Sequence, residues 1–282
     1  MARWLQQQLG ISPGPMQCLE SVEAIKIKER VRTVEAVTAL LGQEVEMANK
    51  YQVYALHGHD DLFYAVEKTN FLGRNLKQCF SQCAPWSLDI LYSQGLGKEP
   101  AFHLDRPSSL SCCCFGRPTV RMTDTKGSVI GSLQDNSICC GPFAFTIQDP
   151  QEQTVLRLDG GLFTCGFWLP LPCGPCSHVE LSITDPQSGA ALGRLQKTVP
   201  SSFKFLTAPD VDNYKVYFEG VRSPEHRALL MATAIFLDFE YFNDNTNDNS
   251  TRQGVMGSLR HRLFGGPDET PRESLMEAFL GR

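Results

Sequence analysis

Long apolar runs are missing from this chain of 282 residues. A membrane-spanning helix needs about 18–20 consecutive apolar residues, and no uninterrupted run reaches that length. The opening stretch, MARWLQQQLG, also lacks the apolar segment of a secretory signal peptide. We therefore expect a cytosolic chain, in a compartment where structural disulfides are rare and the eleven cysteines stay reduced.

An excess of positive charge is absent as well. The net charge is -5 and the pI is near 5.7, so we expect no nucleic-acid partner. Catalytic motifs are also missing, because the six histidines fall in no HExxH pattern and no phosphate-binding GK[ST] follows Gly160 and Gly161. His57 and His59 are typical of an exposed hairpin tip. The sequence therefore predicts a protein without a catalytic centre.

The chain does contain a repeated β pattern. Three stretches, 119–134, 144–159 and 179–196, each consist of an alternating strand, a polar turn opened by an aspartate and a second alternating strand. An aspartate at this place can accept hydrogen bonds from the backbone that follows it and so close the turn. The three aspartates are Asp124, Asp149 and Asp185.

Other strand-like stretches bring the total to about twelve strands. A sheet of this size must close into a barrel or fold into a sandwich, because its edges would otherwise stay unpaired. The additional stretches are 50–56, 62–68, 87–93, 100–106, 203–208 and 213–219.

The two ends of the chain differ from this pattern. Helix-like spacing of apolar residues predicts a helix over 22–41, although the alternation in VEAIKIKERV also fits a strand. We expect residues 1–21 to form a loose arm and the polar residues 244–282 to form a largely disordered tail. These boundaries assign residues 22–243 to one barrel domain.

One stretch, ALLMATAIFLDFEYF at 228–242, is apolar on nearly every face. It is shorter than a bilayer span and more typical of a helix buried on all sides. Two interpretations stay open, a helix that fills the protein core and a helix that inserts into a membrane. The residues that would form its core or membrane surface are Ala228, Leu229, Leu230, Ile235, Phe236, Leu237 and Phe239.

A large barrel followed by such a helix resembles the tubby-like fold, and several segments in order resemble the phospholipid scramblase family. These segments are ALLGQEVEMANKYQVYA, the cysteine run at 112–114, FTIQDPQEQTVLRLDGGLFTC and APDVDNYKVYF ahead of the apolar helix. The resemblance covers about residues 19–243. It implies a mainly β fold, a closed antiparallel barrel of about twelve strands with a central or docked hydrophobic C-terminal helix.

The resemblance also implies a function, the calcium-dependent and ATP-independent movement of phospholipids between membrane leaflets in both directions. A helix of fifteen residues reaches only about 22 Å, whereas the hydrocarbon core of a bilayer is about 30 Å thick. The alternative is therefore an acylated peripheral membrane module, which binds lipid headgroups or protein partners without moving lipids.

Three adjacent cysteines stand in LSCCCFGRPTV, residues 110–120. Exposed thiols on a loop can be acylated, and Arg106, Arg117 and Arg121 would favour the thiolate and attract anionic lipid. Several acyl chains give stable anchoring where one chain gives marginal binding. A plain loop, or cysteines buried as small apolar residues, are the alternatives. The resemblance implies acylation of Cys112, Cys113 and Cys114.

The acidic segment that starts at residue 210 resembles the proposed calcium loop of scramblases. Aspartates at its first and third positions match the start of an EF-hand loop, but Lys215 replaces the glycine and Val221 replaces the closing glutamate. We expect weak calcium binding at most, and an aspartate-rich turn without metal is the alternative. The candidate ligands are Asp210, Asp212, Asn213 and Glu219.

Zinc is less favoured than calcium. Cys173 and Cys176 form a single CxxC pair shortly before His178, and zinc wants four nitrogen or sulfur ligands. The remaining ligands would have to come from Cys165 or from the adjacent pair at 139–140.

The expected location follows from the same resemblance, which implies membrane association on the cytosolic face of the plasma membrane. The segment GRLQK at 193–197 resembles part of a nuclear-import segment of some scramblases, which would add a nuclear pool. The expected partners are the phospholipid membrane and other proteins, but not SH3 or WW domains, because a proline-rich arm is missing.

Overall fold

The fold is taken from a computed structural model of the full chain. It describes residues 14–29, 50–58, 60–68, 85–94, 97–108, 117–137, 143–161, 178–198 and 214–238. The chain divides into two compact units, Met1–Phe236 and Leu237–Arg282. Of the second unit the structure describes only Leu237 and Asp238, so the account below concerns the first.

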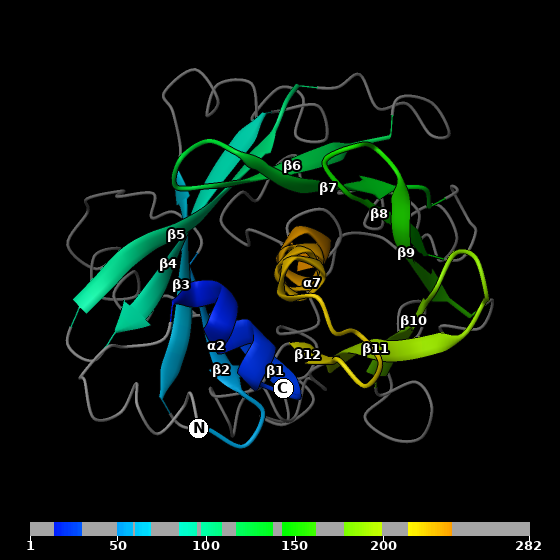
Figure 1. The fold of residues 1–282 in the computed structure, drawn as a ribbon, viewed down its shortest axis with the longest axis horizontal. Coiled ribbons are helices and arrows are strands. Elements are labelled where there is room, and N and C mark those ends of the chain that lie inside the picture. The colour runs from blue at the N-terminus through cyan, green and yellow to red at the C-terminus, as the bar shows by residue number, and fades with distance from the viewer. Residues whose placement is uncertain are drawn as a thin grey trace, which may run out of the picture. The chain divides into compact units, whose positions relative to one another are not determined.

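Twelve antiparallel strands form a closed barrel, in which β1 pairs with both β2 and β12 (Figure 1). This confirms the predicted mainly β barrel, and closure leaves no sheet edge unpaired. The first six strands are β1 (Ala24–Glu29), β2 (Lys50–Ala55), β3 (Asp61–Lys68), β4 (Trp86–Gln94), β5 (Gly97–Arg106) and β6 (Thr119–Asp124). The other six are β7 (Val129–Asp135), β8 (Ala144–Gln148), β9 (Thr154–Gly160), β10 (His178–Thr184), β11 (Ala191–Thr198) and β12 (Tyr214–Tyr217).

The three predicted hairpins are confirmed as β6–β7, β8–β9 and β10–β11. In the first hairpin, Oδ1 of Asp124 accepts hydrogen bonds from the backbone nitrogens of Lys126 and Ser128, each at 2.8 Å. Asp149 does the same in the second hairpin at 2.9 Å, and Asp185 accepts from the backbone of its own turn. The aspartates therefore set the turns as their position in the sequence predicts.

Strand β1 closes the barrel by pairing with β2 and β12, although the sequence pattern predicts a helix in this stretch. The predicted helix over 22–41 is wrong at β1, where Ile25 and Ile27 are fully buried and Lys26 and Lys28 point outward. The alternation in this stretch has the two-residue period of a strand, and pairing on both edges fixes it there. The candidate strand at 203–208 lies outside the described residues.

The expected loose arm also differs at its end. Helix α2 (Pro15–Ser21) begins at a proline in the first helical turn, where the missing N–H is no loss. Cys18 is 6% exposed and Leu19 is fully buried, so the helix is packed against the barrel. The remainder of the arm and the polar tail at 244–282 lie outside the described residues.

Helix α7 (Pro224–Leu237) runs through the middle of the barrel (Figure 1). No residue from 228 to 236 is more than 1% exposed, and Leu237 is also buried. The interpretation as a core helix is thereby confirmed for every candidate residue except Phe239, which lies outside the described residues. Burial of one Leu or Phe side chain contributes about 1.5–3 kcal/mol, so α7 is a major part of the barrel core.

Contacts with the wall fix the position of α7. The ring of Phe236 lies 6.3 Å from Trp86 and 6.1 Å from Phe145, the latter edge to face. Near the other end, a Cβ at Gly131 would lie 2.7 Å from Cδ1 of Leu229 and would overlap a backbone oxygen of β8. The absence of a side chain at Gly131 therefore lets α7 pack closely against strand β7 of the barrel wall. Among the described helices, none combines the length and the apolar character that crossing a bilayer requires.

Candidate functional site

The two ends of the barrel carry different residues. Every strand runs antiparallel to its neighbours, so the strand ends that open onto the connections β1–β2, β3–β4, β5–β6, β7–β8, β9–β10 and β11–β12 share one end. Every cysteine of the chain except Cys18 falls in one of these connections. We therefore name this end the cysteine end. The opposite end, named the turn end, holds the hairpin turns, α2 and the start of α7.

The cysteine run at 112–114 lies outside the described residues; in the sequence it falls between β5 and β6. The three arginines expected around it do not form a common exposed surface. Arg106 is 1% exposed and Arg117 forms an ion pair with Asp135, so the expectation is wrong for both. Arg121 is exposed on β6 and is the one of the three that faces solvent.

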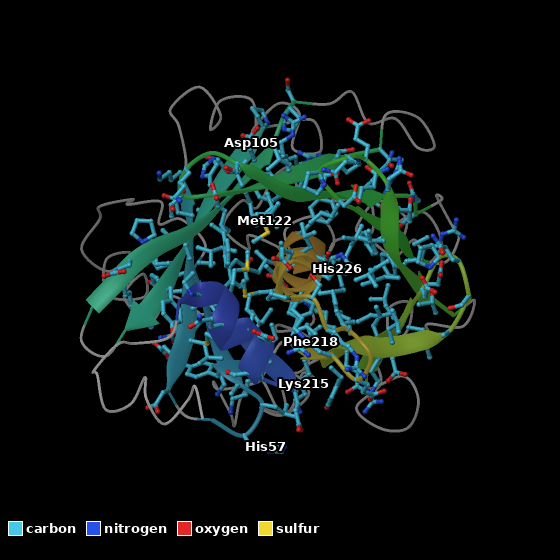
Figure 2. The ribbon with its side chains drawn as sticks, in the orientation of Figure 1. His57, Asp105, Met122, Lys215, Phe218 and His226 are labelled. Atoms are coloured by element: carbon cyan, nitrogen blue, oxygen red, sulfur yellow. The ribbon has the colours of Figure 1, made fainter. Side chains whose placement is uncertain are left out.

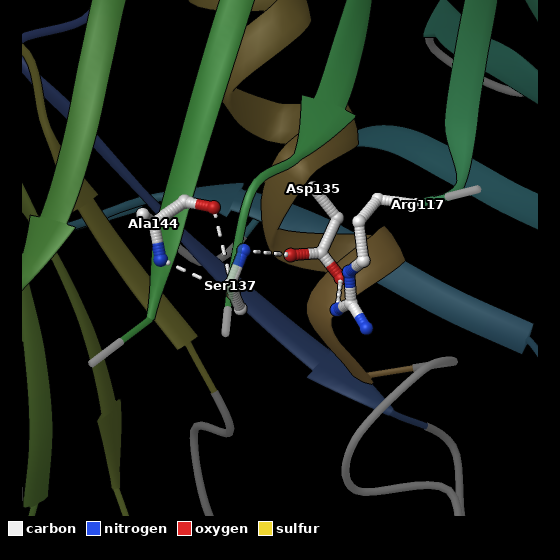
Figure 3. Close-up of polar contacts among 4 residues, drawn as sticks. All are labelled: Arg117, Asp135, Ser137 and Ala144. Atoms are coloured by element: carbon white, nitrogen blue, oxygen red, sulfur yellow. Dashed lines mark hydrogen bonds and ion pairs between the residues drawn. The ribbon is translucent and has the colours of Figure 1, made fainter. Parts of the chain in front are cut away.

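The Arg117–Asp135 pair belongs to a polar junction at the base of the cysteine end (Figure 3). Asp135 is fully buried, and its Oδ1 accepts a hydrogen bond from the backbone nitrogen of Ser137 at 2.8 Å. The hydroxyl of Ser137 accepts one from the backbone nitrogen of Ala144 at 3.1 Å. The junction thus ties together the start of β6, the end of β7 and the start of β8. Loss of the Arg117 or Asp135 side chain would remove a charge-assisted contact from a largely buried site and should destabilise this end of the barrel.

The acidic segment lies partly outside the described residues. Asp210, Asp212 and Asn213 precede β12 and are not described, whereas Glu219 follows β12 at the turn end. A strand rises about 3.3 Å per residue, so β12 separates Glu219 from the acidic segment, and calcium ligands must lie about 2.3–2.6 Å from one ion. The Glu219 carboxylate instead lies 2.8 Å from Nη1 of Arg194. Glu219 is thus already paired with a cation, and the calcium ligand set stays a prediction.

The zinc candidates also lie outside the described residues, except for the backbone of His178 at the start of β10. In the ranges that the structure describes, no three His, Cys, Asp or Glu side chains gather as metal ligands. The zinc candidates among the undescribed cysteines are Cys139, Cys140, Cys165, Cys173 and Cys176. Both metal hypotheses for the undescribed segments stay predictions.

A cleft of about 370 Å³ lies at the turn end, between two hairpin turns, α2 and the start of α7. Its acidic lining consists of Asp124, Asp149 and Glu225, but the first two carboxylates already accept backbone hydrogen bonds of their own turns. His226 also lines the cleft. Burial lowers the pKa of His226, against the opposing effect of the Glu225 and Asp149 carboxylates, so its ring is neutral at pH 7.

Arg227 ties α2 to the rest of the turn end. Its Nη1 donates to the carbonyl oxygens of Leu19 and Val22 at 2.8 Å and of Glu20 at 3.0 Å. Its Nε donates to the carbonyl oxygen of Val221 at 2.7 Å. A cation near the last carbonyls of a helix satisfies acceptors that have no partner within the helix. Arg227 therefore acts as the C-terminal cap of α2.

Cys18 differs from the other cysteines because it lies on the buried face of α2. Burial raises the pKa of the Cys18 thiol, and burial together with Cys18 raises the pKa of Tyr92 to about 12. A thiolate is the reactive form, so this thiol is inert near neutral pH.

The candidate nuclear-import segment at 193–197 is part of β11. Lys197 is 7% exposed and donates a hydrogen bond from Nζ to the hydroxyl of Tyr214 at 2.7 Å. Arg194 lies over the ring of Tyr217 at 4.3 Å. Both basic side chains are thus held on the barrel wall, and the nuclear pool stays a prediction.

Sequence reasoning missed two features that the structure brings together. One is the cap at Arg227, for which no local pattern gives a signal, since its partners lie about two hundred positions away in the chain. The other is a group of basic and aromatic residues on the outer face of β1, β2, β11 and β12. Its signal was present in AIKIKE, where lysines occupy the outward positions of a strand.

Comparison with known proteins gives consistent matches. The family model described as Scramblase matches residues 5–244. Phospholipid scramblase 1 of Rattus norvegicus is 25% identical, with 86% of this chain and 68% of the relative covered. Phospholipid scramblase 1 of Homo sapiens is 24% identical (89% and 72% covered), and phospholipid scramblase 2 of Bos taurus is 25% identical (83% and 73% covered). No solved structure gives a significant match.

Proposed function

The chain belongs to the scramblase family, and from this premise we propose that it mediates or regulates the movement of phospholipids between the two leaflets of a membrane. The observation that carries this proposal is the family match over residues 5–244, which spans the whole barrel and α7. We propose that the movement is bidirectional and needs no ATP, as the resemblance to scramblases implies. The protein acts from the cytosolic face, at the plasma membrane.

Calcium is proposed to stimulate this activity through Asp210, Asp212 and Asn213. Support comes from the resemblance of this segment to the first half of a calcium loop. Calcium bound weakly here would also reduce the repulsion between a chain of net charge -5 and anionic lipid. Glu219 is left out of the set because it lies beyond β12 and pairs with Arg194.

Membrane attachment is proposed to come from acylation of the cysteine run at 112–114. These residues fall between β5 and β6, whose ends open at the cysteine end. More than one acyl chain would provide stable anchoring, since each buried CH₂ contributes about 0.8 kcal/mol and a single chain binds only marginally.

Reconstitution tests the proposed lipid movement. The full chain is placed in phosphatidylcholine and phosphatidylserine vesicles that carry a fluorescent lipid in both leaflets, without ATP. A membrane-impermeant quencher then removes the outer-leaflet signal alone. Scrambling predicts that the inner-leaflet signal is also lost, faster with calcium than with a chelator. Signal loss confined to the outer leaflet under all conditions would reject the proposal.

Variants make the calcium test specific. Replacing Asp210 and Asp212 by asparagine should abolish the calcium stimulation and preserve the calcium-free rate. Glu219→Gln is the control, because it removes a nearby carboxylate that follows β12 and is not part of the proposed ligand set. Equal effects of both changes would contradict the assignment.

A second candidate function is favoured by the position of α7. The helix fills the barrel, and the side chains of residues 228–236 are buried, so a headgroup route through the barrel would have to displace it. A peripheral module would bind membranes or protein partners through its outer surface without moving lipids. In the same assay this candidate predicts vesicle binding without loss of the inner-leaflet signal.

A further inference from the structure

We propose that the outer face of β2, β1, β12 and β11 is the surface with which the barrel lies on an anionic phospholipid membrane. This proposal rests on the proposed membrane function and adds the contact surface and the lipid charge that it recognises. The surface is named the lysine–tyrosine face, and it consists of Lys26, Lys28, Tyr54, Arg194, Lys215 and Tyr217.

The register of the barrel places like charges side by side on this face. Lys26 of β1 lies directly opposite Lys215 of β12 and opposite Tyr54 of β2. Like charges at directly opposite positions destabilise a sheet. Neither lysine forms an ion pair with a described acidic residue. A pair of like charges that lowers the stability of the sheet is typical of a surface that is retained for binding.

Aromatic rings support the cations of the face. The Nζ atoms of Lys26 and Lys28 lie 5.6 Å and 5.9 Å from the ring centre of Tyr54. The guanidinium of Arg194 lies 4.3 Å from the ring centre of Tyr217. Tyrosine and basic side chains with apolar stems are the residues that favour the interface between water and lipid. The face therefore combines positive charge with rings suited to the headgroup region.

Charge complementarity identifies the occupant as an anionic lipid surface. The face holds four cations, of which Arg194 is paired with Glu219. The chain as a whole carries a net charge of -5, so this concentration of positive charge is local. On the opposite side of the barrel, across α7 from Lys215, lies Asp105 (Figure 2). Asp105 is paired in register with Arg121, so that side carries mixed charge.

The test uses Lys215→Glu in the full chain, produced without acylation, and vesicles of phosphatidylcholine with or without phosphatidylserine. One basic residue near an anionic surface changes partitioning about fivefold, and reversal of charge adds repulsion. We expect the wild-type chain to prefer the anionic vesicles and the variant to bind them about tenfold or more weakly. High salt should reduce the wild-type preference.

A stability measurement separates binding from misfolding. Glutamate at position 215 would face Lys26 as an opposite charge, so Lys215→Glu should melt at the same or a higher temperature. Weaker vesicle binding with undiminished melting is the expected signature. Arg157→Glu is the matched control, because Arg157 is exposed on β9 and the change in charge is the same. It should bind the vesicles as the wild type does.

Four results would overturn the proposal. These are equal binding of the wild type to neutral and anionic vesicles, unchanged binding of Lys215→Glu, equal losses in Lys215→Glu and Arg157→Glu, and capture of DNA or a second copy of the chain with anionic vesicles left unbound. Vesicle binding is measured without reconstitution, so its result is independent of lipid movement. A chain that binds anionic vesicles through this face but fails to scramble supports the face and rejects the proposed lipid movement.

Discussion

Arg227 tests how the turn end of the barrel is held together. The change Arg227→Met keeps the length of the side chain and removes all its hydrogen bonds. In the folded protein these bonds reach four carbonyl oxygens, those of Leu19, Glu20, Val22 and Val221, at 2.7–3.0 Å. The loss should therefore act mainly on α2 and on the turn that precedes α7.

The size of the effect follows from the number of hydrogens available. Nη1 has two hydrogens for three acceptors and Nε has one, so the side chain makes about three full bonds. A bond from a charged donor contributes about 1.5–3 kcal/mol, but the freed carbonyls near the surface regain water. Burial also disfavours the charged guanidinium, whose pKa it lowers. We expect a net loss of about 3 kcal/mol in the free energy of unfolding.

Two measurements check this prediction. At about 2–4 °C per kcal/mol, thermal unfolding followed by circular dichroism should show Tm lowered by about 6–12 °C. Hydrogen exchange should show that α2, Pro15–Ser21, loses protection while the central strands keep theirs. Arg227→Lys keeps the charge but has fewer hydrogen-bond donors. Its Tm should lie between those of the wild type and Arg227→Met. An unchanged Tm, or unchanged exchange in α2, would refute the role of Arg227.

Three further predictions concern other parts of the chain. Gly131→Ala should destabilise the barrel by about 1–3 kcal/mol in denaturant titration, because the new methyl would overlap the backbone oxygen of Gln148 in β8 and also meet Leu229 of α7. Gly161→Ala, in open space, should change little. Folding stability should fall as pH drops through about 6.5, since the lowered pKa of His226 means that the unfolded chain binds its proton more readily, and His226→Gln should reduce that loss. Replacement of Cys112, Cys113 and Cys114 by serine should move the protein from the membrane fraction to the soluble fraction. Retention of this variant in membranes would show that the membrane anchor lies elsewhere.

Most of the barrel could be predicted from the sequence because hairpins are local. The two-residue alternation and the aspartate that opens each turn fix a hairpin within about sixteen residues. The core helix was recognisable for a similar reason, since an apolar surface on every face requires burial on all sides. The structure confirms both predictions, as the hairpins β6–β7, β8–β9 and β10–β11 and as helix α7.

The errors arose where a residue's partner lies far away in the chain. The stretch at β1 has both a helical and a strand-like spacing, and pairing with β12 about 190 positions later decides between them. Arg106 was expected near the cysteine run as an exposed cation, but it points into the core at the end of β5. Glu219 is close to the acidic segment in sequence, and the structure shows that it follows β12 and pairs with Arg194 of β11.

Hydrogen exchange of α7, measured by mass spectrometry in solution and on anionic vesicles, tests the central claim that this helix is the core of the barrel. The amides of residues 228–236 are buried within the wall, so we predict strong protection that is the same with and without vesicles. Rapid exchange in solution that becomes slow only on vesicles would show that the helix is completed by lipid and would contradict the account.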